Sequence, residues 1–486
     1  MIYNKAILFI LSVSIWGCNN IDKNIEEVTE VDQEKYRPQY HFTPPSQWMN
    51  DPNGMVYYEG EYHLFYQHYP DSNVWGPMHW GHAVSKDMVS WKHLPIALYP
   101  DTLGYIFSGS AVIDWNNSSG LGNDLHPPMV AIFTYHNPIG AEEGRIDYQT
   151  QGLAYSLDKG RTWTKYENNP VLKNPGIIDF RDPNVAWNET LQQWVMILAV
   201  KDHIEIYTSP NLIAWEKQSE FGQTIGGHGG VWECPDLFTL TDNNGIERWV
   251  MLLSINPGGP QGGSATQYFI GNFDGKTFTP MDSITRWIDH GADNYAGVTW
   301  SDIPKSDGRR LFMGWMSNWQ YANVVPTYTW RSAMTLPREL ILKNTDNGYL
   351  LQSKPVSEIA KYYKAQELTF DQGTLGLKEE ASLVEINNIQ SGDFEIFISN
   401  DLHESVTISI SEETISFDRT QSGLVDFEKG FGTVHSFKNI LSDVKKVQLY
   451  LDKASIEIFI NDGELVMTEI VFPTHYYSLV RIDKIK

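Results

Sequence analysis

Short apolar runs fill the chain from His41 to about Glu339, and they limit what it can fold into. Gly, Pro, Asn and Asp interrupt these runs at close intervals, and no long stretch has the periodicity of an amphipathic helix. Aromatic residues make up 13% of the sequence, a fraction that suits β-strands. The sequence therefore predicts an all-β protein.

A turn that is followed by an aromatic residue recurs along this region, which indicates a repeated unit. The pairs are Asp87 and Trp91, Asp158 and Trp163, Asn211 and Trp215, and Asp274 and Phe278. Their aromatic members are 72, 52 and 63 residues apart, close to a four-stranded blade with loop insertions. Five candidate inner-strand starts have a similar spacing, near Asp51, Ser108, Asp182, Glu233 and Asp293. The spacing predicts a five-bladed β-propeller, and the alternative is a β-sandwich with similar hairpins.

The texture of the sequence changes after the propeller region. We predict the propeller at residues 40–340 and a linker at 341–361, where Trp and Gly become rare. Beyond it, runs such as Ser382–Ile386 and Ser455–Ile460 alternate apolar and polar residues, as half-buried antiparallel strands do. Asn461-Asp462-Gly463 is typical of a hairpin turn. These features predict a C-terminal β-sandwich at 362–486, which we expect to act as a buttress.

The first residues are typical of an export signal. Lys5 precedes the apolar run Ala6–Ile15, which is too short to span a membrane permanently, and Cys18 follows. This pattern resembles a bacterial lipoprotein signal, so 1–18 is predicted to be a signal peptide with lipid attachment at Cys18. The alternative is an ordinary secretory peptide. Residues 19–39 are polar and predict a tether, so we expect an exported protein that reaches a membrane only through its lipid.

The charge of the chain limits its partners. A formal net charge of −24 over 486 residues makes nucleic acid and anionic membrane surfaces poor partners, because an acidic surface repels them. A neutral substrate is easier to reconcile with this field.

Asp51 lies in the stretch Trp48-Met49-Asn50-Asp51-Pro52-Asn53-Gly54, between an aromatic residue and two residues that bend the chain. Pro52 fixes its own φ and Gly54 permits a turn, so we expect Asp51 at the start of a strand that faces a cavity. Alone, the stretch is also compatible with an ordinary turn.

Two more acidic residues fall on predicted inner-strand starts. Asp182 follows Arg181, which can keep a carboxylate ionised, and Glu233 follows Trp232, whose low polarity favours a protonated acid. Hydrolysis of a glycosidic bond needs such a pair, here an ionised Asp51 and a protonated Glu233. Carboxyls about 5–5.5 Å apart would act with retention through a covalent intermediate. The alternatives are a structural ion pair at Asp182 and a turn cap at Glu233.

Three stretches, Trp48–Gly54, Phe180–Pro183 and Trp232–Asp236, resemble the signature motifs of glycoside hydrolase family 32, the fructosidases. The similarity extends to Phe65–Gln67, Trp75–His82, Phe107–Ser110, Met313–Trp319, Leu336–Glu339 and Asp452–Gly463. The resemblance implies a five-bladed propeller followed by a sandwich, and a retaining fructosidase.

Matched motif by motif, the resemblance implies that Asp51 is the nucleophile, Glu233 the general acid/base and Asp182 the transition-state stabiliser. An anion such as Asp182 favours a cationic transition state over the ground state. The residues implied to line the fructose pocket are Asn50, Gln67, Trp75, Phe107, Ser108, Arg181 and Trp315. Of these, Trp75 and Trp315 are assigned to sugar stacking.

Cys234 is the only cysteine after Cys18, so the lipidated chain cannot form an intrachain disulfide. We expect it to be a small buried hydrophobe, with tuning of the neighbouring acid as the alternative. His79, His82 and His228 fit no familiar zinc spacing, so structural or sugar-contacting roles are favoured, and no metal or cofactor is predicted.

The run Pro257–Phe269 resembles exo-acting levanases and exo-inulinases more than invertases. The prediction is hydrolysis of terminal fructosyl units from fructan or fructo-oligosaccharides, levan or inulin, with sucrose as a further substrate. The alternatives are a non-catalytic fructan-binding lipoprotein, a fructosyltransferase and an arabinan-cleaving propeller enzyme.

Overall fold

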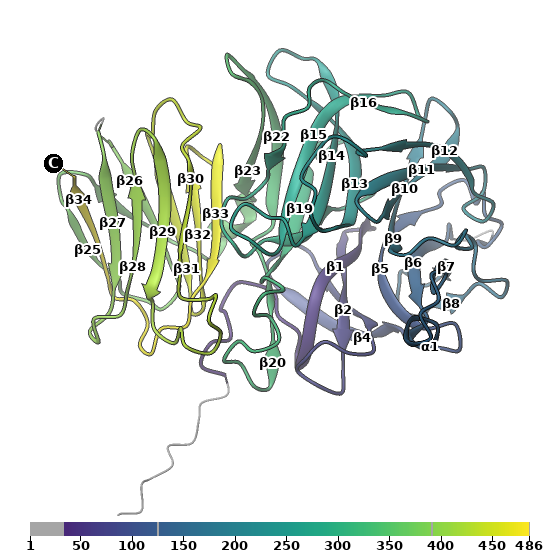
Figure 1. Ribbon diagram of the computed structural model, residues 1–486, viewed down its shortest axis with the longest axis horizontal. Coiled ribbons are helices and arrows are strands. Elements are labelled where there is room, and N and C mark those ends of the chain that lie inside the picture. The colour runs from purple at the N-terminus through teal and green to yellow at the C-terminus, as the bar shows by residue number, and fades with distance from the viewer. Residues whose placement is uncertain (1–33, 124–125, 390–391, 486) are drawn as a thin grey trace, which may run out of the picture. The chain divides into compact units, whose positions relative to one another are not determined.

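The computed structural model describes residues 34–123, 126–389 and 392–485 (Figure 1). The predicted signal peptide, the lipid attachment at Cys18 and residues 19–33 of the predicted tether lie outside these ranges. The described chain is built from strands, which confirms the all-β prediction, with one short helix, α1 (Pro138–Glu142), and one 3-10 turn, η1 (Ser357–Lys361). No helix in the described ranges has the length and apolar composition needed to cross a membrane.

The described part of the chain up to Pro355 contains five sheets, in which most neighbouring strands are antiparallel. The first contains β1 (Gln47–Tyr58), β2 (Glu61–Tyr69), β3 (His79–Ser85), β4 (Trp91–Leu98) and β20 (Trp330–Arg331). The second contains β5 (Tyr105–Ile113), β6 (Met129–His136), β7 (Gln149–Ser156) and β8 (Thr164–Lys165). The third contains β9 (Phe180–Asn188), β10 (Gln193–Val200), β11 (His203–Ser209) and β12 (Glu216–Phe221).

The fourth sheet contains β13 (Val231–Thr241), β14 (Glu247–Asn256), β15 (Ala265–Phe273), β16 (Phe278–Pro280) and β17 (Arg286–Trp287). The fifth contains β18 (Tyr295–Thr299), β19 (Arg310–Met316), β21 (Ala333–Met334), β22 (Arg338–Thr345) and β23 (Gly348–Pro355). The first strands of the five sheets contact one another in a closed order, β1 to β5, β9, β13, β18 and back to β1. Such closure around an axis is the arrangement of a β-propeller.

The repeated turn predicted from the sequence occurs in four of these sheets, each time between the third and fourth strands. In the first sheet, Asp87 Oδ1 accepts the N–H groups of Val89 and Ser90 at 3.1 and 2.9 Å. The indole of Trp91 then donates to Met88 O at 2.8 Å. The same indole-to-backbone bond recurs at Trp163 and Trp215. The repeat in the sequence is therefore a turn that leads into the outer strand of four of the sheets.

The C-terminal region is a β-sandwich of two sheets (Figure 1). One sheet contains β24 (Ala365–Thr369), β26 (Ser382–Asn387), β31 (Val447–Asp452), β32 (Ser455–Ile460) and β33 (Leu465–Ile470). The other contains β25 (Thr374–Gly376), β34 (Leu479–Lys484), β27 (Phe394–Ser399), β28 (Ser405–Ile410), β29 (Thr414–Gln421) and β30 (Val434–Lys438). Apolar side chains from both sheets form one buried core. The predicted turn at Asn461-Asp462-Gly463 joins β32 to β33.

Two stretches differ from the prediction. The expected linker at 341–361 is mostly strand, because β22 and β23 pair along their whole length and complete the fifth sheet. The polar residues that broke the pattern there form the tight turn between these strands, at Asp346 and Asn347. The expected tether at 19–39 also includes residues that pack on the sandwich: Tyr36 is buried and its hydroxyl donates to Phe472 O at 3.3 Å.

Candidate active site

In each of the five sheets that precede Val356, the first strand carries a bulge, in which two of its residues lie opposite one residue of the second strand. The bulged pairs are Asn50-Asp51, Phe107-Ser108, Asp182-Pro183, Cys234-Pro235 and Ala296-Gly297. A bulge bends the strand and re-aims side chains, and it leaves one residue unpaired. Because proline has no N–H to lose, Pro183 and Pro235 suit these positions. The bulges thus direct side chains that are remote in sequence towards one place.

That place is a cavity of about 470 Å³, within the range of small-ligand sites. Nine of the predicted site residues line it, namely Asn50, Asp51, Gln67, Trp75, Phe107, Ser108, Arg181, Asp182 and Glu233. Eight further residues line it that the sequence did not indicate: His136, Tyr148, Gln149, Asp179, Val231, Asn256, Trp319 and Asn323.

Asp51 is held by side chains on either side of its carboxylate. Ser108 Oγ donates to Oδ2 at 2.6 Å and Asn50 Nδ2 donates to Oδ1 at 3.0 Å. The indole of Trp48 fixes Asn50 in turn, with an Nε1 to Oδ1 distance of 2.7 Å. Burial is the main cause that raises the pKa of Asp51, and the charge of Glu233 raises it further. The hydrogen bonds from Ser108 and Asn50 lower it in part. The carboxylate is therefore rigidly placed and close enough to Glu233 to sense its charge.

Asp182 occupies the bulge of β9 with a φ of +63°, a conformation that is strained for a residue with a side chain. Its N–H donates to Thr134 Oγ1 at 2.9 Å, and its Oδ2 accepts the Cys234 N–H at 3.1 Å. Burial raises the pKa of Asp182 to about 7; Arg181 opposes this, and the charges of Glu233 and Asp51 add to it. The acid is thus held among like charges.

Glu233 lies at the start of β13 and is partly open to solvent, with 21% of its side chain exposed. Its Oε1 accepts from Nε and Nη2 of Arg181 at 3.1 and 3.0 Å, and its Oε2 accepts the hydroxyl hydrogen of Tyr295. The low-polarity neighbour expected in Trp232 is absent from these contacts, since Trp232 is fully buried and donates to Gly227 O at 2.8 Å. Successive side chains of a strand point to opposite faces, which separates the two residues.

The sequence placed Arg181 beside Asp182, but its hydrogen bonds go to other carboxylates. It bonds Glu233 and Asp179, with 2.5 Å between Nη1 and Asp179 Oδ1, and its Nε lies 4.0 Å from Asp182 Oδ2. The guanidinium therefore orients Glu233 first and acts on Asp182 from a distance.

Cys234 joins the acidic residues. Its thiol lies 3.5 Å from Asp51 Oδ2 and 3.7 Å from Asp182 Oδ2, and it is the residue that follows Glu233. It is buried and forms no disulfide, and burial followed by the neighbouring carboxylates raises the pKa of its thiol. It is a small buried residue, as expected, and its neutral thiol also fills the space between two of the three acids.

Trp315 does not line the cavity, in contrast to the prediction. It is fully buried and packs against Trp48 and Trp319, with ring centroids 6.2 and 4.9 Å away. Trp319, four residues later, reaches the cavity. Trp75 lines the cavity with 41% of its surface exposed, as the sugar-stacking prediction requires.

The three histidines have separate contacts. His79 Nδ1 bonds Pro77 O at 3.0 Å, and the His82 ring stacks on Phe65 at 4.0 Å. His228 Nδ1 lies 3.0 Å from Asp202 Oδ2.

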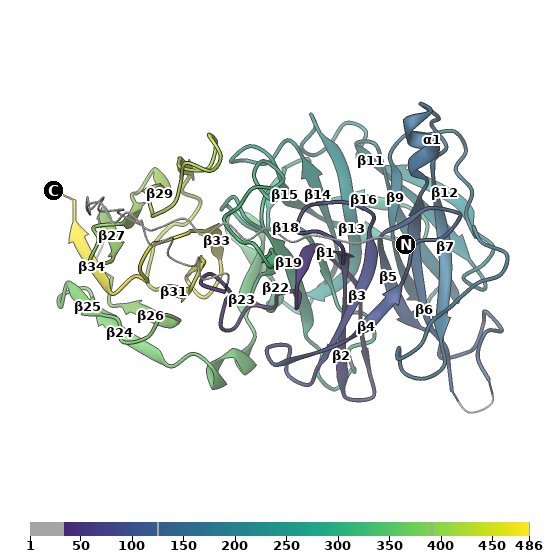
Figure 2. The same ribbon diagram turned by 90° about the horizontal axis from the view of Figure 1, so that it is seen from below.

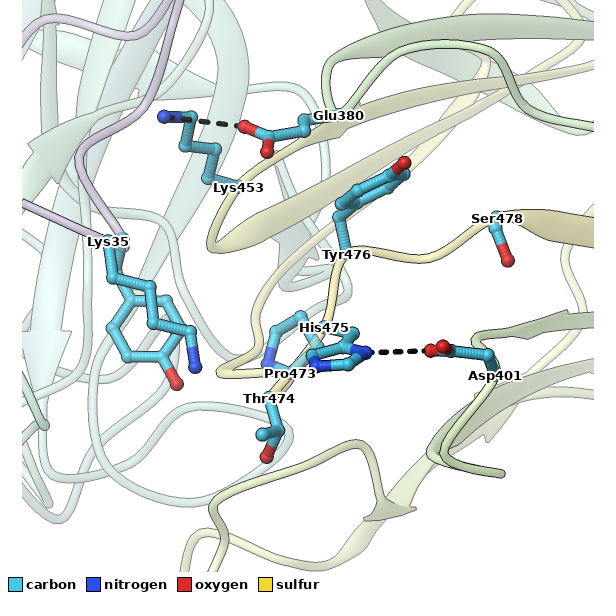
Figure 3. A pocket seen from close by; sticks show the side chains of 10 residues that line it. Lys35, Glu380, Asp401, Lys453, Pro473, Thr474, His475, Tyr476 and Ser478 are labelled. Carbon is cyan, nitrogen blue, oxygen red and sulfur yellow. Dashed lines mark hydrogen bonds and ion pairs between the residues drawn. The ribbon is translucent and has the colours of Figure 1, made fainter. Parts of the chain in front are cut away.

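A second cavity, of about 490 Å³, lies on the sandwich beside residues 35–36 (Figure 3). Each acidic residue that lines it has a basic side chain as its partner: His475 Nδ1 lies 2.8 Å from Asp401 Oδ1, and Lys453 Nζ lies 3.4 Å from Glu380 Oε2. The clustered carboxylates of the propeller cavity have no counterpart in its lining.

Comparison with known proteins identifies the family. The model of the glycosyl hydrolases family 32 N-terminal domain matches residues 41–355, and that of the family 32 C-terminal domain matches 351–483. The chain belongs to glycosyl hydrolase family 32. It is therefore a glycoside hydrolase, and the resemblance noted in the three acidic motifs is confirmed.

Relatives in family 32 match over most of the chain. A levanase of Bacillus subtilis is 48% identical over 462 residues, which cover 90% of this chain and 67% of the levanase. The crystal structure of an exo-inulinase from Aspergillus awamori aligns with a TM-score of 0.81 and 35% identity, covering 92% of this chain and 95% of that one. A fructofuranosidase of Schwanniomyces occidentalis in complex with fructosylnystose aligns with a TM-score of 0.81 and 34% identity, covering 94% and 96%.

Proposed function

We propose that this family 32 enzyme is a retaining, exo-acting β-fructosidase that releases terminal fructosyl units from fructans, and fructose from sucrose. The observation that carries the proposal is the meeting of Asp51, Asp182 and Glu233 at one cavity, with Cys234 between the first two. The names of the related levanase and exo-inulinase support fructan as the substrate class.

The proposed roles follow from the contacts of each acid. Asp51, held by Ser108 and Asn50 and ionised, attacks the anomeric carbon of a bound fructosyl unit and forms a covalent intermediate. Glu233, whose side chain is 21% exposed, protonates the leaving oxygen and later removes a proton from the incoming water. Asp182 lies beyond Cys234 from the nucleophile, where its oxygens can bind sugar hydroxyls and stabilise positive charge.

Two side chains hold the carboxylate of Glu233. Arg181 and Tyr295 both donate to its carboxylate, so the acid must exchange these bonds for the glycosidic oxygen when substrate binds. In the proposed cycle the fructosyl group leaves as free fructose and Asp51 is regenerated as a carboxylate. No cofactor enters this scheme, because two carboxyl groups and water supply the chemistry.

We propose that the cavity walls select a fructosyl unit. Trp75, Phe107 and Trp319 supply an apolar rim, while Asn50 and Gln67 offer amide groups to sugar hydroxyls. Trp319 takes the stacking role that the sequence assigned to Trp315, since Trp315 is buried behind it.

We propose also that the propeller has five blades, supported by the closed order of five first strands with matching bulges. We place the propeller from about residue 40 to the end of β23 and the sandwich after η1. We propose that the protein is exported, as the extracellular exo-inulinases are by name, and anchored through a lipid on Cys18.

The experiment incubates purified protein with levan, inulin and sucrose and follows the released sugars from the first minutes. Fructose as the first and only product of the fructans is expected of an exo-acting hydrolase. Early oligosaccharides would indicate internal cleavage, and growing oligosaccharides at high sucrose would indicate transfer. Absence of fructose from all three substrates would contradict the proposal, and activity on arabinan alone would replace it.

A further inference from the structure

The segment 289–294 of the propeller lies along the sandwich. It connects β17 to β18 and pairs with β33, the edge strand of its sheet. Figure 2 shows β33 on the side of the sandwich that faces the propeller. The N–H of His290 donates to Val466 O at 2.8 Å, and the N–H of Asp293 donates to Thr468 O at 3.0 Å. An uncovered edge strand would leave such backbone groups unpaired. The segment therefore belongs structurally to both domains.

Close approach at this contact depends on Gly291. A Cβ at this position would lie 2.3 Å from Thr468 O and 2.5 Å from Thr468 N, inside any allowed contact. The segment and β33 are thus in direct backbone contact, which leaves little freedom for the segment to shift against the sandwich.

Asp293 anchors the end of the segment through its buried carboxylate. Its Oδ2 accepts from Arg419 Nη1 and from the Ile470 N–H, both at 2.9 Å, and its Oδ1 accepts the Tyr321 hydroxyl at 2.5 Å. Arg419 comes from β29 of the sandwich, is fully buried, and also lies 3.2 Å from Glu469 Oε2. The carboxylate of one domain is therefore fixed by the guanidinium of the other.

The anchored segment leads directly into the active site. Tyr295, two residues after Asp293, begins β18 and donates its hydroxyl hydrogen to Glu233 Oε2. Ala292 O accepts from Asn318 Nδ2 at 2.9 Å, and the next residue along the chain, Trp319, lines the cavity. Movement of the segment would displace the Tyr295 hydroxyl from the acid.

We propose that Arg419 and Asp293 are positioning residues, through which the sandwich sets the place of Tyr295 and thereby of Glu233. This inference rests on the proposed function, because it assigns the acid/base role to Glu233. Buried ion pairs are weak sources of stability but hold geometry well, and a catalytic group works only within about 0.5 Å of its productive position. The sandwich is then part of the catalytic apparatus as well as a buttress.

The matched control is Asp452, a buried carboxylate of the same interface. Its oxygens accept the N–H groups of Gln39 and Tyr40 at 2.8 and 3.0 Å and bond His41 Nδ1 at 2.8 Å. These partners lie before β1, three ion pairs away from segment 289–294: His41 bonds Glu457, Glu457 bonds Arg338, and Arg338 bonds Asp289. The variants Asp293→Asn and Asp452→Asn each remove one buried charge from the interface, but only Asp293 lies on the segment that leads directly to Tyr295.

The test compares kcat/KM on a fructo-oligosaccharide, whose leaving group needs protonation, with kcat/KM on fructosyl fluoride, whose leaving group does not. We expect Asp293→Asn to lose about 10-fold or more on the oligosaccharide and less than about 3-fold on the fluoride, as for a partly misplaced acid. Asp452→Asn is expected to change both rates by the same factor. In a Tyr295→Phe background, Asp293→Asn should leave the ratio of the two rates unchanged.

Equal losses on both substrates, the same selective loss in Asp452→Asn, or an undiminished effect in the Tyr295→Phe background would overturn the inference. If Asp293→Asn does not fold, Arg419→Lys, which keeps the charge but alters the geometry, is expected to give the same selective loss. Wild-type activity separates the two proposals: no hydrolysis of the oligosaccharide by the wild type refutes the function, whereas an active wild type with unselective variants refutes only the inference.

Discussion

Replacing Asp182 by Asn should stabilise the protein at neutral and alkaline pH while abolishing efficient hydrolysis. The pKa of Asp182 is raised to about 7, primarily by burial, whereas an unfolded chain gives an aspartate a pKa of about 3.9. Between these values the folded protein binds a proton that the unfolded chain has lost. The free energy of unfolding therefore falls as pH rises from about 4 to 7. Above pH 7 Asp182 is ionised in both states, and its full destabilising effect on the folded protein is present.

The size of the effect follows from the pKa difference. A difference of about three between the folded and unfolded pKa values corresponds to a change of about 4 kcal/mol in the free energy of unfolding. Part of this cost is shared with Asp51 and Glu233, whose charges also act on Asp182, and an amide in the site loses some hydrogen bonding. We expect Asp182→Asn to gain about 2–3 kcal/mol at pH 8 and close to nothing at pH 4.

The assay is urea unfolding of wild type and variant at pH 4, 5, 6, 7 and 8, with the difference in midpoint as the readout. Asp289→Asn is the control of opposite sign: burial alone would raise the pKa of Asp289, but Arg338 and Thr468 outweigh it and hold that pKa below its ordinary value. That variant should lose stability by nearly the same amount from pH 8 to pH 5, and the loss should begin to shrink only near pH 4, where the aspartates of the unfolded chain take up protons. A midpoint difference for Asp182→Asn that is constant with pH, or negative at pH 8, would refute the reasoning.

Three further outcomes are expected. Glu233→Ala should lower kcat/KM on fructan by about 10²–10⁴ and leave that on fructosyl fluoride near the wild-type value; equal losses in initial-rate assays would remove Glu233 as the acid. Glu233→Gln removes a charge that raises the pKa of Asp51, so the acidic limb of the pH profile with fructosyl fluoride should move to lower pH, and a limb that stays or rises would contradict this. Trp319→Ala should raise KM with little change in Tm, whereas Trp315→Ala should cost about 3–5 kcal/mol in unfolding experiments; the reverse pattern would restore Trp315 as the sugar contact.

Much of the propeller was predictable because its turns are local. An Asp or Asn side chain accepts backbone N–H groups within four residues, so the spacing from Asp87 to Trp91 is visible in the sequence. The same spacing recurs at Asn211 and Asp274 and is one residue longer at Asp158. The misjudged stretches were those in which local pattern and tertiary pairing disagree. Residues 341–355 include few aromatic residues and yet belong to two paired strands. Tyr36 lies in a polar segment, and its ring nevertheless packs against Phe472.

The acidic residues of the site were predictable because a proline lies within or directly after the bulge in three of the first strands. Asp51, Asp182 and Glu233 all stand one or two residues before a proline at the start of a strand. Residues that reach the cavity from second and third strands carried no such sign, as His136 and Gln149 show.

Tyr295 was missed although the predicted strand start at Asp293 is two residues away. Its contact with Glu233 depends on the closure of the propeller, which brings β18 beside β13. The exchange of Trp319 for Trp315 has a similar origin, because only packing decides which of two nearby indoles reaches the surface of the cavity.

The central claim is that Asp51 is the nucleophile and that a different residue, Glu233, is the general acid/base. Mass spectrometry of a trapped intermediate tests this claim most directly. Glu233→Ala is mixed with fructosyl fluoride, quenched in acid and digested, since this variant forms the intermediate but hydrolyses it slowly. A fructosyl group on the peptide that contains Asp51 is the predicted result. A label on a peptide that contains Asp182 or any other residue, or turnover of the fluoride with inversion and no label, would contradict it.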